Sequence, residues 1–276
     1  MKLLILISVL ACAFAEISDY HEKIGIPLAI RLKKLELARD FDGSRIFGGH
    51  EAPLGAYPHM AGLVIPLSIN FDSVCGAALI SSTRVLTAAH CMVSDARNIT
   101  VVLGSRTVYY GGVRVKATEA VNHPEWDIYK GLANDIAVMF IPPVTFTDII
   151  QPINLYTGNS DLSGVWASIS GYGITGSSQT LTPDQTLKHM QTQVISNEEC
   201  QKSSRIPILE SNICTRSGDN NDNVCSSDSG GPLSLGSGRN GFLIGVVSFG
   251  AGNCELGLPS AFAKVSYYAP WIISLM

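Results

Sequence analysis

The chain carries little charge and contains no basic run. Only 15% of its 276 residues are Asp, Glu, Lys or Arg, and the formal net charge at pH 7 is −4. Proteins that bind nucleic acid or anionic membranes gather Lys and Arg into patches or stripes. The sequence therefore argues against both classes, and we expect neither nucleic acid nor a membrane as a partner.

Apolar runs long enough to span a bilayer are also missing. The run at residues 3–10 falls well short of the ~20 residues that a membrane helix needs. Ala13 and Ala15 follow it as an Ala-x-Ala cleavage pattern before Glu16, which is typical of a secretory signal. The sequence thus predicts a signal peptide at 1–15 and a product that is secreted and extracellular.

The usual metal-binding patterns are absent. The sequence has no Cys-x-x-Cys pair, and the stretch 103–119 lacks the paired acidic residues of a calcium loop. We therefore expect no metal and no other cofactor. Cysteines are nevertheless present in a number typical of disulfide bonds in a secreted protein, and the sequence alone does not choose among their pairings. Beyond Cys12 in the predicted signal, they are Cys75, Cys91, Cys200, Cys214, Cys225 and Cys254.

Short apolar runs separated by turn residues fill the chain from residue 46 onward. They are rich in Val and Ile and are broken by Gly, Pro and Asn, which is typical of an antiparallel barrel or sandwich. A hydrophobic content of 46% is ample for a buried core, and the end of the chain, 267–276, is predicted to be helical. The expected strands are 59–65, 74–80, 99–103, 113–121, 135–141, 164–170, 187–195, 232–235 and 242–249.

Ser229 lies in the sequence CSSDSGGP at 225–232, between an acidic residue and two glycines. A serine hydroxyl is almost wholly protonated at neutral pH, so it becomes a strong nucleophile only beside a base. The motif therefore predicts a nucleophilic serine, and it requires a base elsewhere in the chain.

His90 is the candidate base, and Asp135 is the candidate acid that orients it. His90 directly follows an apolar run and is anchored by Cys91, and a general base must hold its geometry closely. Asp135 opens an apolar strand, where its carboxylate would be buried behind the imidazole. It would then select the tautomer whose outer nitrogen accepts the serine proton.

The sequences LTAAHC at 86–91, NDIAV at 134–138 and CSSDSGGP at 225–232 follow one another in the order His, Asp, Ser. In this order and with these neighbours, they resemble the chymotrypsin-like serine peptidases from Ile46 to the C-terminus. The resemblance implies an all-β fold of two six-stranded antiparallel β-barrels with a C-terminal helix, and an active site in the cleft between the barrels. It also implies the disulfides Cys75–Cys91, Cys200–Cys214 and Cys225–Cys254.

Arg45 precedes the sequence IFGG at 46–49, which is similar to the activation junction of that family. A trypsin-like protease would cut after Arg45. The new ammonium group of Ile46 would then pair with Asp228, because a buried carboxylate without a partner is too costly beside the nucleophile.

We therefore expect an activation propeptide at 16–45 and a peptidase catalytic domain at 46–276. The charged stretch 30–37 of the propeptide is predicted to form an amphipathic helix. Because residues 16–45 contain no cysteine, we expect this segment to dissociate after the cut.

The resemblance also implies an oxyanion hole formed by the backbone N–H groups of Ser227 and Ser229. Active members of the family nearly always have glycine where this chain has Ser227. A Cβ atom restricts the backbone there, and losing one oxyanion donor costs about 10²- to 10³-fold in rate. Ser227 is thus the one departure that argues for weak catalysis.

By the same resemblance, the primary substrate pocket has Asn223 at its base, Gly250 and Ser260 as walls, and Val224 and Ser248 beside them. Asn223 is neutral, so it cannot offset the desolvation of a cationic side chain, and trypsin-like cleavage is not expected. Gly250 leaves the mouth open, which favours cleavage after Phe, Tyr, Leu or Met. Val224 and Ser260 narrow the interior, which leaves elastase-like cleavage as an alternative. Backbone groups at 248–250 would pair with an extended substrate strand.

We interpret the sequence as the secreted zymogen of a serine endopeptidase, a hydrolase acting on protein or peptide substrates. The sequence GGHEAPLG at 48–55 and the small disulfide set resemble arthropod digestive chymotrypsin-like and collagenolytic (brachyurin-like) enzymes. We expect a monomer whose partners are a trypsin-like activating protease and protein protease inhibitors. Asn98 begins the sequence Asn-Ile-Thr and is a candidate glycosylation site.

Two alternatives stay open. One is elastase-like or collagenolytic specificity within the same class. The other is a serine protease homologue that has lost catalysis and acts as a binding protein, which Ser227 favours and the intact His90, Asp135 and Ser229 oppose. Reaction of Ser229 with a fluorophosphonate would separate the two classes.

Overall fold

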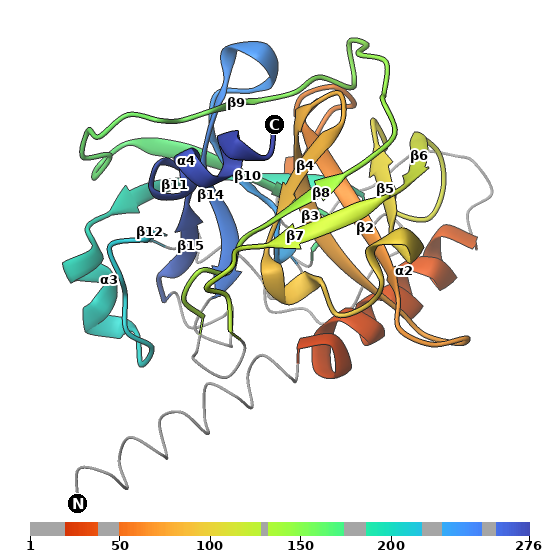
Figure 1. The fold of residues 1–276 in the computed structure, drawn as a ribbon, viewed down its shortest axis with the longest axis horizontal. Coiled ribbons are helices and arrows are strands. Elements are labelled where there is room, and N and C mark those ends of the chain that lie inside the picture. Colours follow the sequence, from red (N-terminus) through yellow and green to blue (C-terminus); the bar gives the residue numbers. More distant parts are fainter. Residues whose placement is uncertain (1–19, 38–49, 128–131, 174–185, 217–227, 250–257) are drawn as a thin grey trace, which may run out of the picture.

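The computed structural model describes residues 20–37, 50–127, 132–173, 186–216, 228–249 and 258–276. The described residues form two β-sheets that lie side by side, each curved into a barrel-like shape, and helix α4 (Val265–Ser274) ends the chain (Figure 1). This confirms the expected all-β fold with a C-terminal helix. Among the described residues, none of the helices has the length and apolar character that crossing a membrane requires.

The first sheet joins seven strands in the order β6-β5-β2-β3-β4-β8-β7, and each of its pairings is antiparallel. Its strands are β2 (Met60–Pro66), β3 (Asp72–Ser81), β4 (Arg84–Thr87), β5 (Thr100–Leu103), β6 (Val113–Lys116), β7 (Glu119–Asn122) and β8 (Ala137–Phe140).

The stretch 113–121, predicted as one strand, is divided into β6 and β7 by a bend. Next to this bend, the N–H of Ala117 donates to the carbonyl of Ile99 at 3.1 Å, and that of Thr118 donates to Phe140 at 2.8 Å. β6 pairs with β5, whereas β7 pairs with β8 at the other end of the sheet. One bent stretch therefore joins both edges, which closes the sheet and leaves six continuous chain segments in it.

The second sheet joins eight strands in the order β1-β11-β10-β13-β14-β15-β12, with β9 added beside β14. A pairing between β11 and β12 closes β10 to β15 into a ring of six strands. The added β9 runs parallel to β14, unlike the other pairings. The strands are β1 (His50–Glu51), β9 (Asn154–Leu155), β10 (Trp166–Gly171), β11 (Lys188–Ile195), β12 (Asn212–Thr215), β13 (Pro232–Leu235), β14 (Phe242–Phe249) and β15 (Ser260–Lys264).

The helices lie at the ends and edges of the sheets. The N-terminal segment forms a π-helical turn, η1 (His21–Gly25), which continues into α2 (Ile26–Leu37) beside the first sheet (Figure 1). Helix α3 (Asn197–Ser203) begins after Ser196, whose hydroxyl accepts the N–H of Glu199 as an N-cap. Within the described ranges, the remaining short helices are the 3₁₀ turns η2 (Ala89–Cys91), η3 (Ala96–Asn98) and η7 (Gly238–Asn240).

Each sheet encloses apolar side chains, because alternate side chains of a strand point to the same face. The first core includes Leu63, Leu79, Leu86, Leu103, Ile136 and Met139. The first core continues into Leu243 and Val246 of the second sheet. The second core includes Ala167, Ile169, Ile213, Leu233, Ile244 and Phe262.

The two sheets touch backbone to backbone at Gly76 of β3. Its N–H donates to the carbonyl of Ser229 at 2.7 Å. A Cβ atom at Gly76 would lie 2.8 Å from the Cα of Gly231, a distance shorter than Cβ atoms show in real structures. A glycine is required here, and it fixes the Ser229 loop against the first sheet.

Candidate active site

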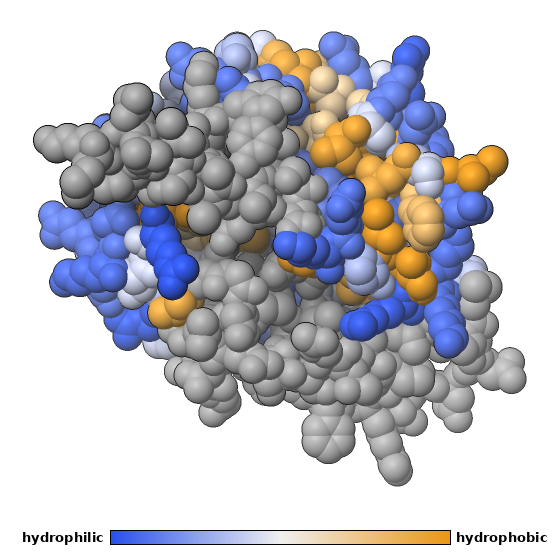
Figure 2. All heavy atoms as spheres, turned by 90° about the horizontal axis from the view of Figure 1, so that it is seen from below, coloured by the Kyte–Doolittle hydropathy of each residue, from blue (hydrophilic) through white to orange (hydrophobic). Residues whose placement is uncertain are grey.

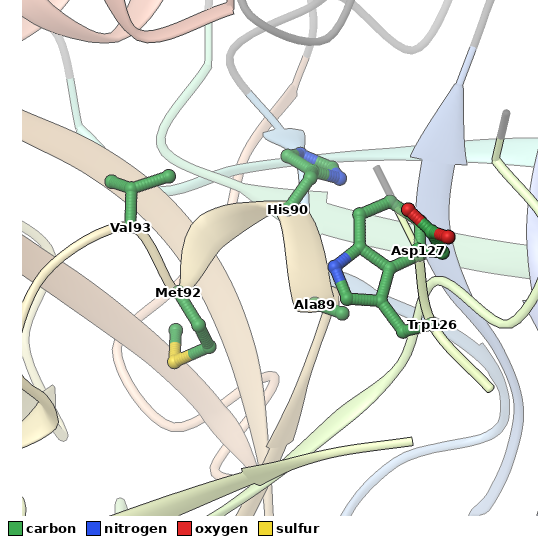
Figure 3. A pocket seen from close by; sticks show the side chains of 6 residues that line it. All are labelled: Ala89, His90, Met92, Val93, Trp126 and Asp127. Carbon is green, nitrogen blue, oxygen red and sulfur yellow. The ribbon is translucent and has the colours of Figure 1, made fainter. Parts of the chain in front are cut away.

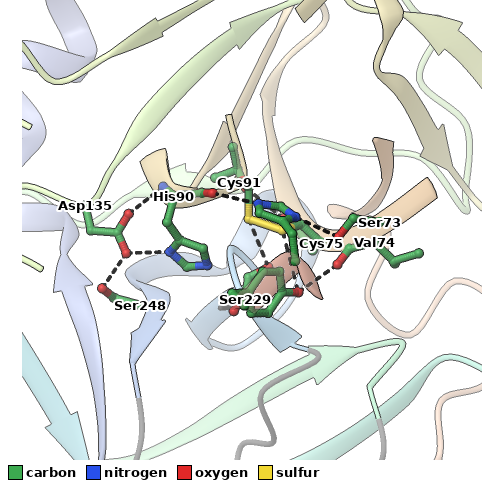
Figure 4. Close-up of a disulfide and its surroundings, with 12 residues drawn as sticks. Ser73, Val74, Cys75, His90, Cys91, Asp135, Ser229 and Ser248 are labelled. Carbon is green, nitrogen blue, oxygen red and sulfur yellow. Dashed lines mark hydrogen bonds and ion pairs between the residues drawn. A yellow bond between two sulfur atoms is a disulfide. The ribbon is translucent and has the colours of Figure 1, made fainter. Parts of the chain in front are cut away.

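His90 and Asp135 are brought together by two paired strands. His90 lies in η2, just after β4, and Asp135 lies just before β8; Thr87 of β4 is opposite Ala137 of β8. The carboxylate of Asp135 accepts two hydrogen bonds from His90: Oδ2 from the ring Nδ1 at 2.8 Å, and Oδ1 from the backbone N–H at 2.9 Å (Figure 4). Because an ionised carboxylate only accepts, Nδ1 carries the proton and Nε2 is left as the acceptor.

Burial strengthens this pair. Asp135 is 1% exposed and His90 is 6% exposed, so water screens the contact little. The hydroxyl of Ser248 near the end of β14 donates a further hydrogen bond to Asp135 Oδ2 at 2.6 Å (Figure 4). The predicted place of Ser248 in the substrate pocket stays a prediction, and the hydrogen bond from its side chain to Asp135 is a further contact that the sequence did not indicate.

Asn134 adopts a backbone conformation that is unusual for a residue with a side chain. Its φ is +59°, and no other non-glycine residue in the described ranges has a positive φ. The hydroxyl of Tyr268 in α4 donates to Asn134 Oδ1 at 3.1 Å. Asparagine tolerates this region better than most residues, and the turn directs the next residue, Asp135, toward His90.

Ser229 lies in a tight turn between the two sheets and is 5% exposed. The N–H of Gly230 donates to the carbonyl of Val247 at 2.8 Å, and Gly230 has a φ of +80°. A Cβ atom at Gly230 would lie 2.2 Å from Thr87 Oγ1. Only glycine therefore fits after Ser229, and the turn brings Ser229 beside His90 (Figure 4).

Asp228 is buried on the other side of the same turn. Its Oδ1 accepts the N–H of Gly173 at 3.0 Å. A Cβ atom at Gly171 would lie 2.1 Å from that oxygen, so the β10 backbone approaches the carboxylate closely. Arg45 and Ile46, expected at the activation junction, lie outside the described residues.

Two of the three implied disulfides lie within the described residues, and both are formed. Cys75 is bonded to Cys91 with an S–S distance of 2.07 Å, and Cys200 is bonded to Cys214 at 2.01 Å. The sulfurs of Cys75 and Cys91 lie close to His90, but they are bonded to each other and so cannot act as thiolate metal ligands. The first disulfide anchors the turn that carries His90 (Figure 4).

Several predicted site residues lie outside the described part of the chain, and their roles stay predictions. Ser260 is described: it begins β15, is buried, and pairs with Thr215. Asn98 ends η3 and is exposed, as a glycosylated residue must be. The residues outside are Asn223, Val224, Ser227 and Gly250, together with the Cys225–Cys254 pair.

A cavity of about 330 Å³ opens beside His90 (Figure 3). Met92, Val93 and Trp126 give it apolar walls, and Asp127 adds a carboxylate. This arrangement offers space for a substrate side chain next to the catalytic histidine candidate, and no pattern in the sequence indicated it.

A side chain from the N-terminal segment also reaches the site. The ring of Tyr20 stands edge-on to the ring of His90, with 5.2 Å between the ring centroids. The sequence predicts a helix within 16–45, and α2 is present, but none of the sequence motifs includes Tyr20. No local pattern marks it, since its contacts with the site are to residues more than fifty positions away.

Comparisons with known proteins agree with this geometry. The family model described as Trypsin matches residues 46–272. The collagenase of Hypoderma lineatum is 40% identical over 235 residues, which cover 83% of this chain and 86% of that protein. The brachyurin of Leptuca pugilator is 35% identical over 232 residues, covering 82% of this chain and 96% of that protein. The solved structure of HL collagenase superposes with a TM-score of 0.72 at 37% identity, covering 83% of this chain and 98% of that one. The chain therefore belongs to the trypsin family of serine proteases.

Proposed function

We propose that this protein is the precursor of a secreted serine endopeptidase with Ser229 as nucleophile, His90 as general base and Asp135 as the orienting acid. The observation that carries the proposal is the two-point contact of Asp135 with His90, supported by Ser248. It holds the imidazole in the tautomer whose Nε2 can accept a proton.

The reaction follows from these roles. The Oγ of Ser229 bonds to the carbonyl carbon of the substrate while its proton passes to His90 Nε2. The C–N bond then breaks, and His90 gives the proton to the leaving amine. A water molecule then attacks the acyl-enzyme in the same way, giving a proton to His90. The ester bond to Ser229 breaks, His90 returns the proton to Ser229 Oγ, and the carboxylic acid product leaves. The N–H groups of Ser227 and Ser229 would stabilise the oxyanion that forms in each half.

The activation step is part of the proposal. A cut after Arg45 would create the ammonium group of Ile46, which would displace or join Gly173 as a partner of the Asp228 carboxylate. The burial of Asp228 supports this, because a buried carboxylate gains most from a full positive charge. Two disulfides support secretion, since they are typical of oxidising compartments.

For specificity, we propose cleavage after large apolar residues, on the grounds of the neutral Asn223 and the small Gly250. Collagen cleavage is the second candidate, because a relative and a structural neighbour are both named collagenase. A panel that includes native collagen beside short peptides separates these two specificities.

The proposal is tested by hydrolysis of peptide substrates ending in Phe, Leu, Ala or Arg, before and after trypsin treatment. Fast hydrolysis at Phe or Leu only after treatment supports the zymogen, the triad and the pocket together. A Ser229→Ala protein, treated in parallel, controls for residual trypsin. Complete cutting at Arg45 with no hydrolysis and no fluorophosphonate labelling would instead indicate an inactive homologue that binds proteins.

A further inference from the structure

The N-terminal segment 20–37 packs on the catalytic unit through one face. η1 and α2 lie along β3 in the first sheet (Figure 1). The buried side chains recur at the spacing of a helical stripe, whereas the outer face is exposed. The buried residues are Tyr20, His21, Gly25, Leu28, Ala29, Leu32 and Glu36.

Tyr20 occupies space beside the nucleophile. Its hydroxyl donates to the carbonyl of Val74 at 2.7 Å and lies 3.7 Å from the Cys75 sulfur. Its side chain also lies close enough to the side chain of Ser229 to interact with it. With its ring edge-on to His90, Tyr20 lies where a peptide bond must come within about 3 Å of Ser229 to react.

His21 clamps the segment to both parts of the site. Its Nδ1 lies 2.8 Å from Ser73 Oγ on β3, and its Nε2 lies 3.0 Å from the main-chain carbonyl of His90. Because a carbonyl only accepts, Nε2 carries the proton and Nδ1 accepts from the Ser73 hydroxyl. The contact ties the segment to the backbone of the catalytic histidine itself.

A close approach at Gly25 brings the segment against β3. A Cβ atom there would lie 1.9 Å from Ser73 Oγ and 3.4 Å from the ring of Tyr20. A residue with a side chain would therefore push η1 away from β3. Gly25 is thus the residue that allows Tyr20 and His21 to reach the site.

The helix α2 then buries an apolar patch. Leu28, Ala29 and Leu32 are each 3% exposed or less, and they share one cluster with Val74 and Val108 of the catalytic unit. Burying two leucines in this way contributes several kcal/mol, by area, to holding the segment.

Glu36 anchors the far end. Its Oε1 accepts the backbone N–H of Val108 at 2.9 Å, and its Oε2 accepts that of Tyr109 at 2.7 Å. Burial raises the pKa of this carboxyl, and the two hydrogen bonds oppose the shift. Because one carboxylate accepts two backbone N–H groups, the position of α2 along the surface of the catalytic unit is fixed.

We propose that residues 20–37 are a reversible inhibitor of the active site, which blocks it through Tyr20 and remains bound after the bond following Arg45 is cut. The inference rests on the proposed peptidase function. The segment contains no cysteine, so only the contacts described hold it once the chain is cut. Activation then has two steps: the cut that frees Ile46, and the departure of Tyr20. The fraction of the cut segment 16–45 that dissociates then depends on the protein concentration.

The outer face of the segment offers a route to its removal. Arg31, Lys33 and Lys34 are exposed on α2, and Lys23 is exposed on η1. Hydrophilic side chains lie beside an apolar band on the side of the molecule seen from below in Figure 2. A trypsin-like activator cuts after Lys and Arg, so the protease that cuts at Arg45 can also destroy the inhibitor.

The test separates the two cuts. In the full chain, residues 41–45 are replaced by the recognition sequence of enteropeptidase, so that only the bond before Ile46 is cut. The cut protein is diluted stepwise, and hydrolysis per mole of protein is measured at each concentration. In parallel, a fluorescein-labelled peptide of residues 20–37 is added, and its anisotropy reports binding without the need for activity.

We expect specific activity to rise on dilution and to fall again when the peptide is added. Tyr20→Ala should weaken the inhibition about 10²-fold, because a large buried side chain is lost. Lys34→Ala, on the exposed face, is the matched control and should behave as the unaltered chain. Tyr20→Phe, which keeps the ring, serves if Tyr20→Ala does not fold, and it should give a smaller loss.

Constant specific activity on dilution with no peptide binding overturns the inference while the peptidase function stands. A cut protein that is inert at every dilution and takes no fluorophosphonate overturns the proposed function instead. In that case the anisotropy alone decides: binding that depends on Tyr20 supports the inference, and absence of binding overturns it.

Discussion

Asp135 contacts His90 at two points, the ring Nδ1 and the backbone N–H, so the carboxylate fixes both the tautomer and the position of the imidazole. Asp135→Asn keeps one acceptor oxygen but replaces the other with an NH₂ group. That group donates hydrogen bonds, so it cannot accept one from the ring Nδ1 or the backbone N–H of His90. We expect kcat to fall about 10⁴-fold with little change in KM, because the wrong tautomer is then favoured. Steady-state kinetics on the activated protein measure this.

Ser248→Ala is the control for that experiment, since it removes a single hydrogen bond to Asp135. Its effect should be about tenfold, as expected for one bond to a charged group. An Asp135→Asn enzyme that retains more than a tenth of the activity would contradict the assigned role of Asp135.

Gly230→Ala should unfold at a lower temperature and lose activity. The new Cβ would lie 2.2 Å from Thr87 Oγ1 at a φ of +80°, so the turn of Ser229 must shift. We expect a loss of about 3 kcal/mol or more in the free energy of unfolding. Thermal unfolding followed by circular dichroism measures it.

Gly236→Ala is a matched control for Gly230→Ala. Gly236 also has a positive φ, +68°, but a Cβ atom there would meet nothing closer than 3.5 Å. It should cost only about 1 kcal/mol, the strain of the backbone alone. Equal losses in the two variants would show that crowding at Ser229 is not what requires glycine.

Binding of the segment 20–37 should weaken in acid. Burial lowers the pKa of His21 from 6.5 to about 4, and the nearby His90 ring contributes less to this shift. In the bound segment, the imidazole faces Ser73, the His90 carbonyl and Tyr20. The free segment binds a proton below pH 6.5, whereas the bound one does not until about pH 4. Affinity is therefore full above pH 6.5 and is lost progressively down to pH 4, by about 10²-fold.

The anisotropy of the labelled peptide between pH 7.5 and 5 measures this dependence. His21→Gln, which cannot titrate, should bind with a flatter pH profile. Glu36 acts in the opposite direction, because its raised pKa makes the bound form the better proton acceptor. A His21→Gln profile as steep as that of the unaltered peptide would rule out His21 as the source.

Ser227→Gly should raise kcat. A glycine relieves the backbone restriction at the first oxyanion donor, and one such donor is worth about 10² or more in rate. Presteady-state acylation with a Phe or Leu ester is the direct measurement, because the acyl step contains the first oxyanion. An unchanged acylation rate would show that Ser227 already presents its N–H.

Much of the fold was predictable because strands and turns leave a local pattern. β13 and β14 have the predicted bounds, and the other predicted strands, apart from the divided 113–121, end within two residues of expectation. β1, β4, β9, β12 and β15 were missed, since they are short and contain polar residues such as those of β12 (Asn212–Thr215). Helix α2 begins at Ile26, four residues before the predicted stretch 30–37.

By itself, the sequence determined the class of fold and the candidate residues His90, Asp135 and Ser229, because each lies in a distinctive local sequence. Only the tertiary structure decided what surrounds them. The hydroxyl of Ser248 contacts Asp135, 113 positions away in the chain. The ring of Tyr20 contacts His90, which is about 70 positions away. Such contacts depend on how strands pair and how a helix docks, and neither leaves a signal in the residues on either side.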